Sequence, residues 1–337
     1  MRRLFIVVLI VGAIIAVSIR EYRLHHQSPS EEAFVGGRGA TVWNSTAEIR
    51  TPVASLTYGQ SVHVYDHYAQ EALVSTPSGV RGWVSSASLM DPDLWRSAEL
   101  LAESAKNMPI QAVGHTRART NLHTRPGVDA PVILQAPADT PLVVLQHSMA
   151  ATPSAGSSAA AAALNSDDWW LVRADVKNAG SVTGWALGRL IALNLPDSLR
   201  GYQSSEDINI VAWFEIDRAL DSSSQQYRPE YLVAGTRGRQ TACDFTLLRV
   251  YTWSSARDRY ETAFMDSHVC GKLPVEVAPA KSPVEDAYFS FDNIAANGIE
   301  KRRYRMRLTT VRRIDVNFDV VRHASKGIRV RAERAHS

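Results

Sequence analysis

One short pattern occurs twice in the sequence, and it limits the folds that the chain can adopt. Gly82-Trp83 and Gly184-Trp185 each follow a Leu-Val pair and a polar loop, and each precedes a single short helical turn. Short strands that are separated by turn signals at this frequency are typical of small antiparallel barrels. The repeat therefore predicts two copies of one β domain, over residues 40–90 and 115–192.

The second copy opens with a motif that allows a comparison with a known family. Arg119-Thr120-Asn121 leads into Arg125-Pro126-Gly127, and Gly184-Trp185-Ala186 follows near the end of the copy. In these residues the chain resembles the bacterial SH3-like (SH3b) domain family, whose members carry an R-x-N-x-R-x-x-P opening and a late Gly-Trp strand. The resemblance implies two small SH3-like barrels of five strands each, and binding of cell-wall peptides beside a hydrolase domain or a membrane anchor.

The glycines and tryptophans of the repeat are expected in the cores of their barrels. Aromatic side chains bury a large apolar area and dominate small cores. We therefore place Gly82, Trp83, Gly184 and Trp185 in the two barrel cores.

The N-terminus has the layout of a targeting segment. Residues 4–19 form an uncharged apolar run between Arg2-Arg3 and Arg20. As a helix this run would be about 24 Å long, close to the length that crosses a bilayer. Residues 1–23 are thus a signal-anchor or a cleaved signal peptide. The first alternative predicts a single-pass protein of the bacterial inner membrane with the bulk of the chain outside the cytoplasm, and the second a secreted protein.

Polar and periodic segments separate the predicted domains. Residues 24–39 read as a linker. Helical spacing of apolar residues predicts a helix within a linker at 91–114. A low-complexity insertion at 148–166 interrupts the second barrel, and a C-terminal β-rich domain over 205–320 precedes a basic tail at 321–337. The expected fold class is all-β, with an N-terminal membrane or signal helix and one linker helix.

The C-terminal domain carries an excess of positive charge. From residue 300 to the end there are 12 Lys and Arg against 4 Asp and Glu. Arg303, Arg305 and Arg307 alternate with apolar residues, which predicts an antiparallel strand with one arginine face. A solvated strand face explains the pattern, and attraction to anionic lipid or an acidic envelope polymer is the alternative.

Cys243 and Cys270 are the two cysteines of the chain. In an exported, hairpin-rich domain such a pair favours a disulfide over free thiols. Neither cysteine lies in a nucleophile motif, and two cysteines cannot form a four-cysteine zinc site.

The sequence contains no motif for a metal or a cofactor. His-Glu-x-x-His, Gly-x-Ser-x-Gly and a phosphate-binding loop are all absent. The net charge of +3 provides no overall basic field for nucleic acid. We therefore expect no metal, no cofactor and no nucleic acid partner.

Aromatic residues supply the candidate ligand site. Adjacent strand residues point to opposite faces, so one of Trp169 and Trp170 is expected at the surface or at a contact between domains. With Asp168 beside them, and with Tyr65 and Tyr68 of the first copy, they form the predicted ligand-binding rim.

The function expected from these features is binding. A non-enzymatic envelope adaptor would use its SH3-like domains to bind peptidoglycan peptides or an envelope protein. Two alternatives remain open: a cell-wall hydrolase whose catalytic domain is the C-terminal unit, and a structural spacer without a ligand.

Overall fold

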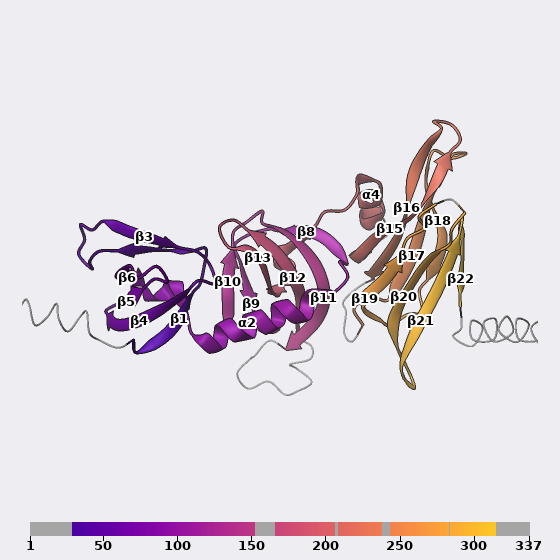
Figure 1. Cartoon of the computed structure of the whole chain (residues 1–337). Helices are drawn as coiled ribbons and strands as arrows, with labels where there is room; N and C mark the ends of the chain where they lie inside the picture. Colours follow the sequence, from indigo (N-terminus) through magenta and orange to yellow (C-terminus); the bar gives the residue numbers. More distant parts are fainter. Residues whose placement is uncertain (1–28, 152–165, 206–207, 238–242, 283, 315–337) are drawn as a thin grey trace, which may run out of the picture. The chain divides into compact units, whose positions relative to one another are not determined.

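The chain is mostly β, as the sequence predicts. A computed structural model places the strands in four antiparallel sheets, two of seven strands and two of four (Figure 1). The residues that it describes are 29–151, 166–205, 208–237, 243–282 and 284–314. They divide into two compact units: residues 29–97 with 177–180, and the remaining described residues from 98 onward.

The first unit contains one seven-stranded sheet in the order β3-β2-β6-β5-β4-β1-β7. Its core consists of small and branched apolar side chains, among them Val35, Val42, Val64 and Val74. The elements are β1 (Glu31–Val35), β2 (Ala40–Trp43), β3 (Pro52–Leu56), β4 (Ser61–Tyr68), β5 (Glu71–Ser75), β6 (Arg81–Ser85), η1 (Ser86–Ser88) and β7 (Leu89–Met90).

The predicted linker at 24–39 is wrong for its second half. Strand β1 lies within it and pairs with both β4 and β7. Ala33 and Val35 are buried in the core of the sheet. Five residues that begin with two glutamates carry little periodic signal, so tertiary pairing decided this strand.

Helix α2 (Pro92–Ala105) forms where helical spacing predicts it. Asp91 caps its first turn, because the carboxylate accepts a 2.8 Å hydrogen bond from the backbone N–H of Leu94. At its other end, a guanidinium nitrogen of Arg173 donates a 2.7 Å bond to the carbonyl of Ala105. Both ends of the helix are therefore satisfied by side chains.

The second unit begins with another seven-stranded sheet, in the order β10-β9-β13-β12-β11-β8-β14. Trp169, Leu171, Trp185 and Leu145 form its core together with Ala105 of α2. The elements are β8 (Ala112–Thr116), β9 (Thr120–His123), β10 (Val132–Ala136), β11 (Pro141–Ala151), β12 (Ser166–Val176), β13 (Gly180–Leu187), η2 (Gly188–Leu190) and β14 (Ile191–Leu193).

The two seven-stranded sheets have the same strand order when each strand is matched in chain sequence. The Gly-Trp dipeptides lie at equivalent places, in β6 and β13. Strand β8 starts at Ala112, inside the predicted helical linker, so the second copy begins earlier than expected. The insertion joins the paired ends of β11 and β12, where Ala151 lies opposite Ser166, and residues 152–165 lie outside the described part.

Two four-stranded sheets follow, with α4 (Asp197–Ser205) before them. Leu199 of α4 is fully buried against the first of these sheets, so the C-terminal domain starts before the predicted residue 205. The strands are β15 (Asn209–Asp221), β16 (Gln226–Thr236), β17 (Leu247–Ser254) and β18 (Arg259–Asp266) in one sheet, and β19 (Gly271–Ala278), β20 (Ala287–Ala295), β21 (Gly298–Arg307) and β22 (Thr310–Arg313) in the other.

The two four-stranded sheets pack on each other through aromatic residues. The ring of Phe264 in β18 lies 5.7 Å from that of Tyr304 in β21. The hydroxyl of Tyr304 donates a 2.9 Å hydrogen bond to Asp266. Tyr304 and Met306 are buried while Arg303 and Arg307 are exposed, so β21 alternates between a core face and an arginine face.

The cysteine pair forms the predicted disulfide. Cys243 and Cys270 are bonded, with their Cα atoms 4.8 Å apart. The covalent loop encloses the hairpin of β17 and β18.

No helix in the described ranges is long and apolar enough to cross a membrane. The predicted segment at 4–19 lies outside those ranges, as does the predicted basic tail at 321–337.

Candidate functional site

A buried histidine between two carboxylates is the centre of the candidate site. His147, on β11, is 4% exposed. Its Nδ1 lies 2.8 Å from Asp244 Oδ1, and its Nε2 bonds Asp168. Burial lowers the pKa of His147, but the hydrogen bonds and charges of Asp168 and Asp244 outweigh it and raise the pKa to about 9. The imidazole is therefore a cation at neutral pH.

Asp244 gathers three donors around its buried carboxylate. Besides His147, the Nζ of Lys272 lies 2.6 Å from Oδ1, and the backbone N–H of Leu273 donates a 2.8 Å bond to Oδ2. The neighbouring Cys243 is held by its disulfide. Two cations and an N–H balance a buried charge that would otherwise be costly.

Asp168 connects this charge network to the surface. Its side chain is 43% exposed. One oxygen bonds His147, and the other accepts a 2.7 Å bond from the indole Nε1 of Trp170. A Cβ on Gly188 would lie 2.2 Å from Asp168 Oδ2 and 2.5 Å from the indole nitrogen. Only glycine leaves room for this arrangement at position 188.

A pocket opens beside Asp168 and Trp170. It has a volume of about 510 Å³, within the usual range of ligand sites. Its apolar lining comes from Trp170 and from residues of β14, of the segment that follows it and of β15. The lining residues are Arg117, Asp168, Trp170, Gly188, Arg189, Ile191, Leu193, Leu195, Asn209 and Ile210.

Positively and negatively charged side chains line this pocket. Arg117 is exposed, and its Nε donates a 3.0 Å bond to the carbonyl of Ile191. The guanidinium of Arg189 lies 3.4 Å from Asp167 and is 70% exposed. With Asp168, which is paired with His147, the lining presents two cations and one carboxylate beside apolar side chains. Such a surface suits a ligand that carries a carboxylate and an apolar group.

Both tryptophans of β12 are buried, so the alternative of a tryptophan at the surface is wrong. Trp169 is 1% exposed and Trp170 is 7% exposed. Trp169 packs in the sheet core, and the centre of its ring lies 5.2 Å from that of His123, with the two rings perpendicular. Trp170 faces the other way, and its ring lies 5.0 Å from that of His147. Both faces of β12 are thus covered, which alternation alone could not indicate.

The predicted tyrosines lie in the other compact unit, so the structure does not unite them with Asp168 in one unit. The guanidinium of Arg81 lies 4.0 Å above the ring of Tyr65. Tyr68 is 64% exposed, and the centre of its ring lies 6.5 Å from that of Trp83.

The Gly-Trp residues differ between the two copies. Trp185 is buried in its core, but Trp83 is only half-buried, so the core prediction is wrong for Trp83. Both glycines are required by close packing of strands. A Cβ on Gly82 would lie 2.5 Å from the carbonyl oxygen of Trp43, and a Cβ on Gly184 would lie 2.7 Å from the Cβ of Leu122.

The opening motif of the second copy lines a smaller pocket of about 220 Å³. Arg119, Asn121 and His123 contribute to it. The Nδ1 of His123 lies 2.8 Å from the carbonyl oxygen of Ala130, which orients the ring.

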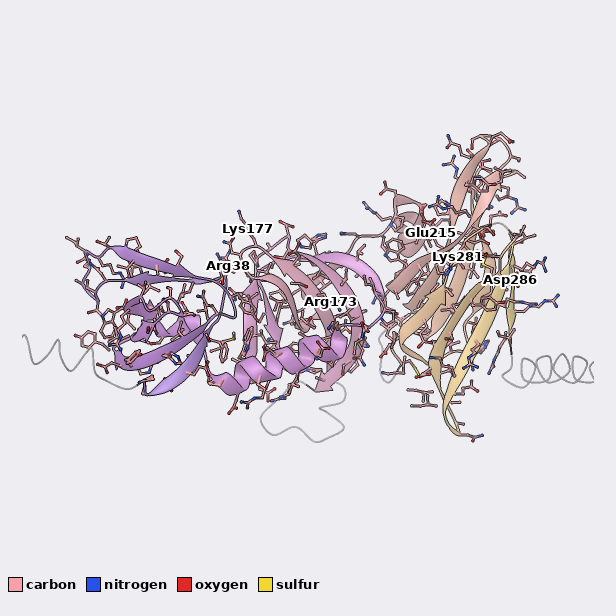
Figure 2. All side chains as sticks on the ribbon, in the orientation of Figure 1. Arg38, Arg173, Lys177, Glu215, Lys281 and Asp286 are labelled. Carbon is pink, nitrogen blue, oxygen red and sulfur yellow. A yellow bond between two sulfur atoms is a disulfide. The ribbon has the colours of Figure 1, made fainter. Side chains whose placement is uncertain are left out.

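A third pocket, of about 630 Å³, lies in the C-terminal domain, between β15 and the segment after β19. Glu215, Asp217, Tyr227 and Lys281 line it, and Figure 2 labels Glu215 and Lys281. Asp217 is opposite Glu230 in the β15–β16 pair. Burial raises the pKa of both carboxyls, and that of Glu230 reaches about 7.

Sequence reasoning missed His147, Asp244 and Lys272. His147 occurs in a strand of apolar residues, and Asp244 follows a cysteine, but these signals do not link residues that are 97 positions apart. Among the described residues, no group of three or more His, Cys, Asp or Glu side chains is arranged to hold a metal ion.

Comparisons with known proteins complete the description of the site. No family model matches the chain, and no curated protein matches it. Among solved structures, NlpC2 from Trichomonas vaginalis matches at 10% identity and a TM-score of 0.17, over 86% of this chain and 97% of that one. A NlpC/P60 family protein from Bacillus cereus matches at 13% identity and a TM-score of 0.18, over 69% and 93%. Likenesses at such TM-scores carry no argument about fold or function.

Proposed function

We propose that this chain is a non-enzymatic adaptor of the bacterial cell envelope, with two SH3-like domains in tandem. The shared strand order of the two seven-stranded sheets and the equivalent Gly-Trp strands support this assignment. The apolar segment at 4–19 would anchor the protein in the inner membrane or direct its secretion.

The pocket beside Asp168 is the observation that carries the proposal. Apolar side chains of β14 and β15 line it together with Arg117 and Arg189. A peptide with a free carboxylate and small apolar side chains, such as a peptidoglycan stem peptide, has the matching chemistry. A segment of an envelope protein is the other ligand of this class.

The residues around the pocket favour binding over catalysis. Both ring nitrogens of His147 bond carboxylates, so neither is available to abstract a proton from a ligand. Both cysteines are joined in a disulfide, so neither can act as a thiolate nucleophile.

One observation supports the hydrolase alternative. Asp217 and Glu230 are cross-strand neighbours whose carboxyl pKa values are raised, and Asp217 lines the 630 Å³ pocket. Carboxyls with raised pKa values are the usual general acids of glycoside cleavage. Glu230 itself is 2% exposed, which favours a structural role for it.

Co-sedimentation with peptidoglycan sacculi tests both candidates. The full chain, purified in mild detergent, is compared with R117E and with R119E as its matched control. Arg117 and Arg119 are exposed arginines two residues apart, but each lines a different pocket. We expect R117E to weaken binding about tenfold, because a charged hydrogen bond is worth about 1.5–3 kcal/mol, while R119E binds like the wild type.

The outcomes separate the alternatives. Loss of binding in R119E alone would place the ligand in the smaller pocket, which Arg119 lines. If the wild-type chain released soluble muropeptides and D217N did not, the C-terminal domain would be an enzyme. Absence of binding by the wild-type chain would leave an envelope protein as the ligand, or the spacer.

A further inference from the structure

A stripe of arginines follows the outer face of β21 and β22. Arg303, Arg305 and Arg307 alternate along β21, and Arg312 of β22 lies directly opposite Arg305. Side chains two residues apart on a strand are about 7 Å apart, and directly opposite ones are about 5 Å apart at Cβ. Four guanidinium groups therefore lie within one short row.

Few negative charges balance this row. Asp286, which precedes β20 and is labelled in Figure 2, lies 3.7 Å from Arg305 and 3.8 Å from Arg307. Arg303 and Arg312 are exposed and form no ion pair within the described part of the chain. In the described part of the chain, Asp286 is thus the one carboxylate that forms ion pairs with this row, and it pairs with two of the four arginines.

The pairing of Arg305 with Arg312 is unfavourable by itself. Like charges that are directly opposite on one face of a sheet repel each other. An anion held between the two strands would relieve this repulsion, which gives the row a reason to bind one.

The other acidic residues of this face lie toward β19 and β20, because Glu276 and Arg303 are both opposite Ser290 in the ladder. Lys301 contacts Glu276 of β19 at 2.9 Å and Asp292 of β20 at 3.8 Å. Hydrogen bonds from Lys301 and Ser290 lower the pKa of Glu276, and the charge of Arg303 contributes to the shift. Positive charge is hence confined to a stripe along β21 and β22, and does not cover the whole face.

We propose that this stripe binds a linear polyanion with repeated phosphate groups. A chain with regularly spaced charges can follow a row of guanidinium groups, each of which can hold phosphate oxygens in a bidentate manner. A flat anionic bilayer would also meet Glu276 and Asp292. The inference is independent of the pocket beside Asp168, because the two sites share no residue.

Binding of long-chain inorganic polyphosphate to the full chain, in mild detergent at 50 mM salt, tests this inference. The variant R303E/R312E changes the net charge by four. Its matched control, R38E/K177E, makes the same change at two exposed basic residues (Figure 2). We expect the first variant to weaken binding about tenfold or more, since each surface arginine contributes about 1 kcal/mol, and the control to bind within about twofold of wild type.

A neutral variant and a second anionic ligand complete the test. The neutral variant R303Q/R312Q should give an intermediate affinity, and circular dichroism reports whether each variant folds. Equal losses in both charge-reversal variants, or no binding by the wild type at 50 mM salt, would overturn the proposal. So would arginine-dependent retention on phosphatidylglycerol vesicles that is stronger than the binding of polyphosphate.

Discussion

The imidazole of His147 and the carboxylate of Asp244 join the second seven-stranded sheet to the disulfide-bonded segment of the C-terminal domain, at 2.8 Å. Both side chains are 1% exposed. Asp168 holds the opposite nitrogen, and Lys272 holds Asp244 from the other side. The four groups alternate in charge, so removal of any one of them takes one of two partners from a buried charge.

This arrangement predicts a pH-dependent stability that originates at His147. Its pKa is raised from 6.5 to about 9. Because the folded protein binds the proton more tightly, the stabilisation is complete below pH 6.5 and disappears as pH rises through 9. The loss should be on the order of 3 kcal/mol. Urea denaturation of wild type and H147Q at pH 6, 7.5 and 9 measures it.

The variant H147Q should show little of this dependence, although it is less stable at pH 6. A matched variant at the partly exposed His115, H115Q, keeps the wild-type profile. Parallel pH profiles of wild type and H147Q would contradict a charged imidazole.

Glu230 predicts a second pH effect at lower pH. Burial raises its pKa from 4.5 to about 7, and the Thr252 hydroxyl donates a hydrogen bond to it. As pH rises, Glu230 ionises at a lower pH in the unfolded chain than in the folded protein. The stabilisation that is present below pH 4.5 is therefore lost as pH rises through 7, and the loss is on the order of 3 kcal/mol. The variant E230Q should therefore be more stable than wild type at pH 8 and similar to it at pH 4.5.

The same denaturation series reports this effect, provided that E230Q is compared at pH 4.5, 6 and 8. The exposed Glu99 of α2 offers a control, because E99Q should leave the profile unchanged. A stability difference between E230Q and wild type that does not vary with pH would exclude titration of Glu230 as the cause.

The disulfide should stabilise the C-terminal domain. Closing a loop over a separation of 27 residues contributes about 3 kcal/mol in the chain-entropy model. We expect C243S/C270S to lower the denaturation midpoint, and dithiothreitol to lower that of wild type but not of the variant. Unchanged midpoints under reduction would show that the bond contributes no stability.

Alanine at the repeated glycines should destabilise both seven-stranded sheets. Neither Gly82 nor Gly184 has space for a Cβ, so G82A and G184A should each cost about 1–3 kcal/mol. A Cβ on Gly201, in α4, would meet no atom within 4 Å, and G201A should stabilise the helix by up to about 1 kcal/mol. Thermal unfolding of the three variants provides the comparison, and a neutral G184A would contradict the close strand contact.

The sequence alone determined the repeat, the β-rich class, the helix after Asp91 and the disulfide. Each depends on local periodicity, on capping chemistry or on a pair of residues that has no alternative partner. The alternation from Arg303 to Arg307 likewise predicts the face that β21 exposes, since the period of a strand is a property of its backbone.

Tertiary structure alone decided which side chains meet. Strand β1 forms because β4 and β7 pair with it, and Trp170 is buried because His147 and Asp168 cover the face of β12 that alternation assigned to solvent. His147 and Asp244 come together across 97 residues, and neither carries a local signal of the other. Long-range packing sets burial, and burial sets the pKa values, so the charge network and its pocket could not be predicted before the fold was known.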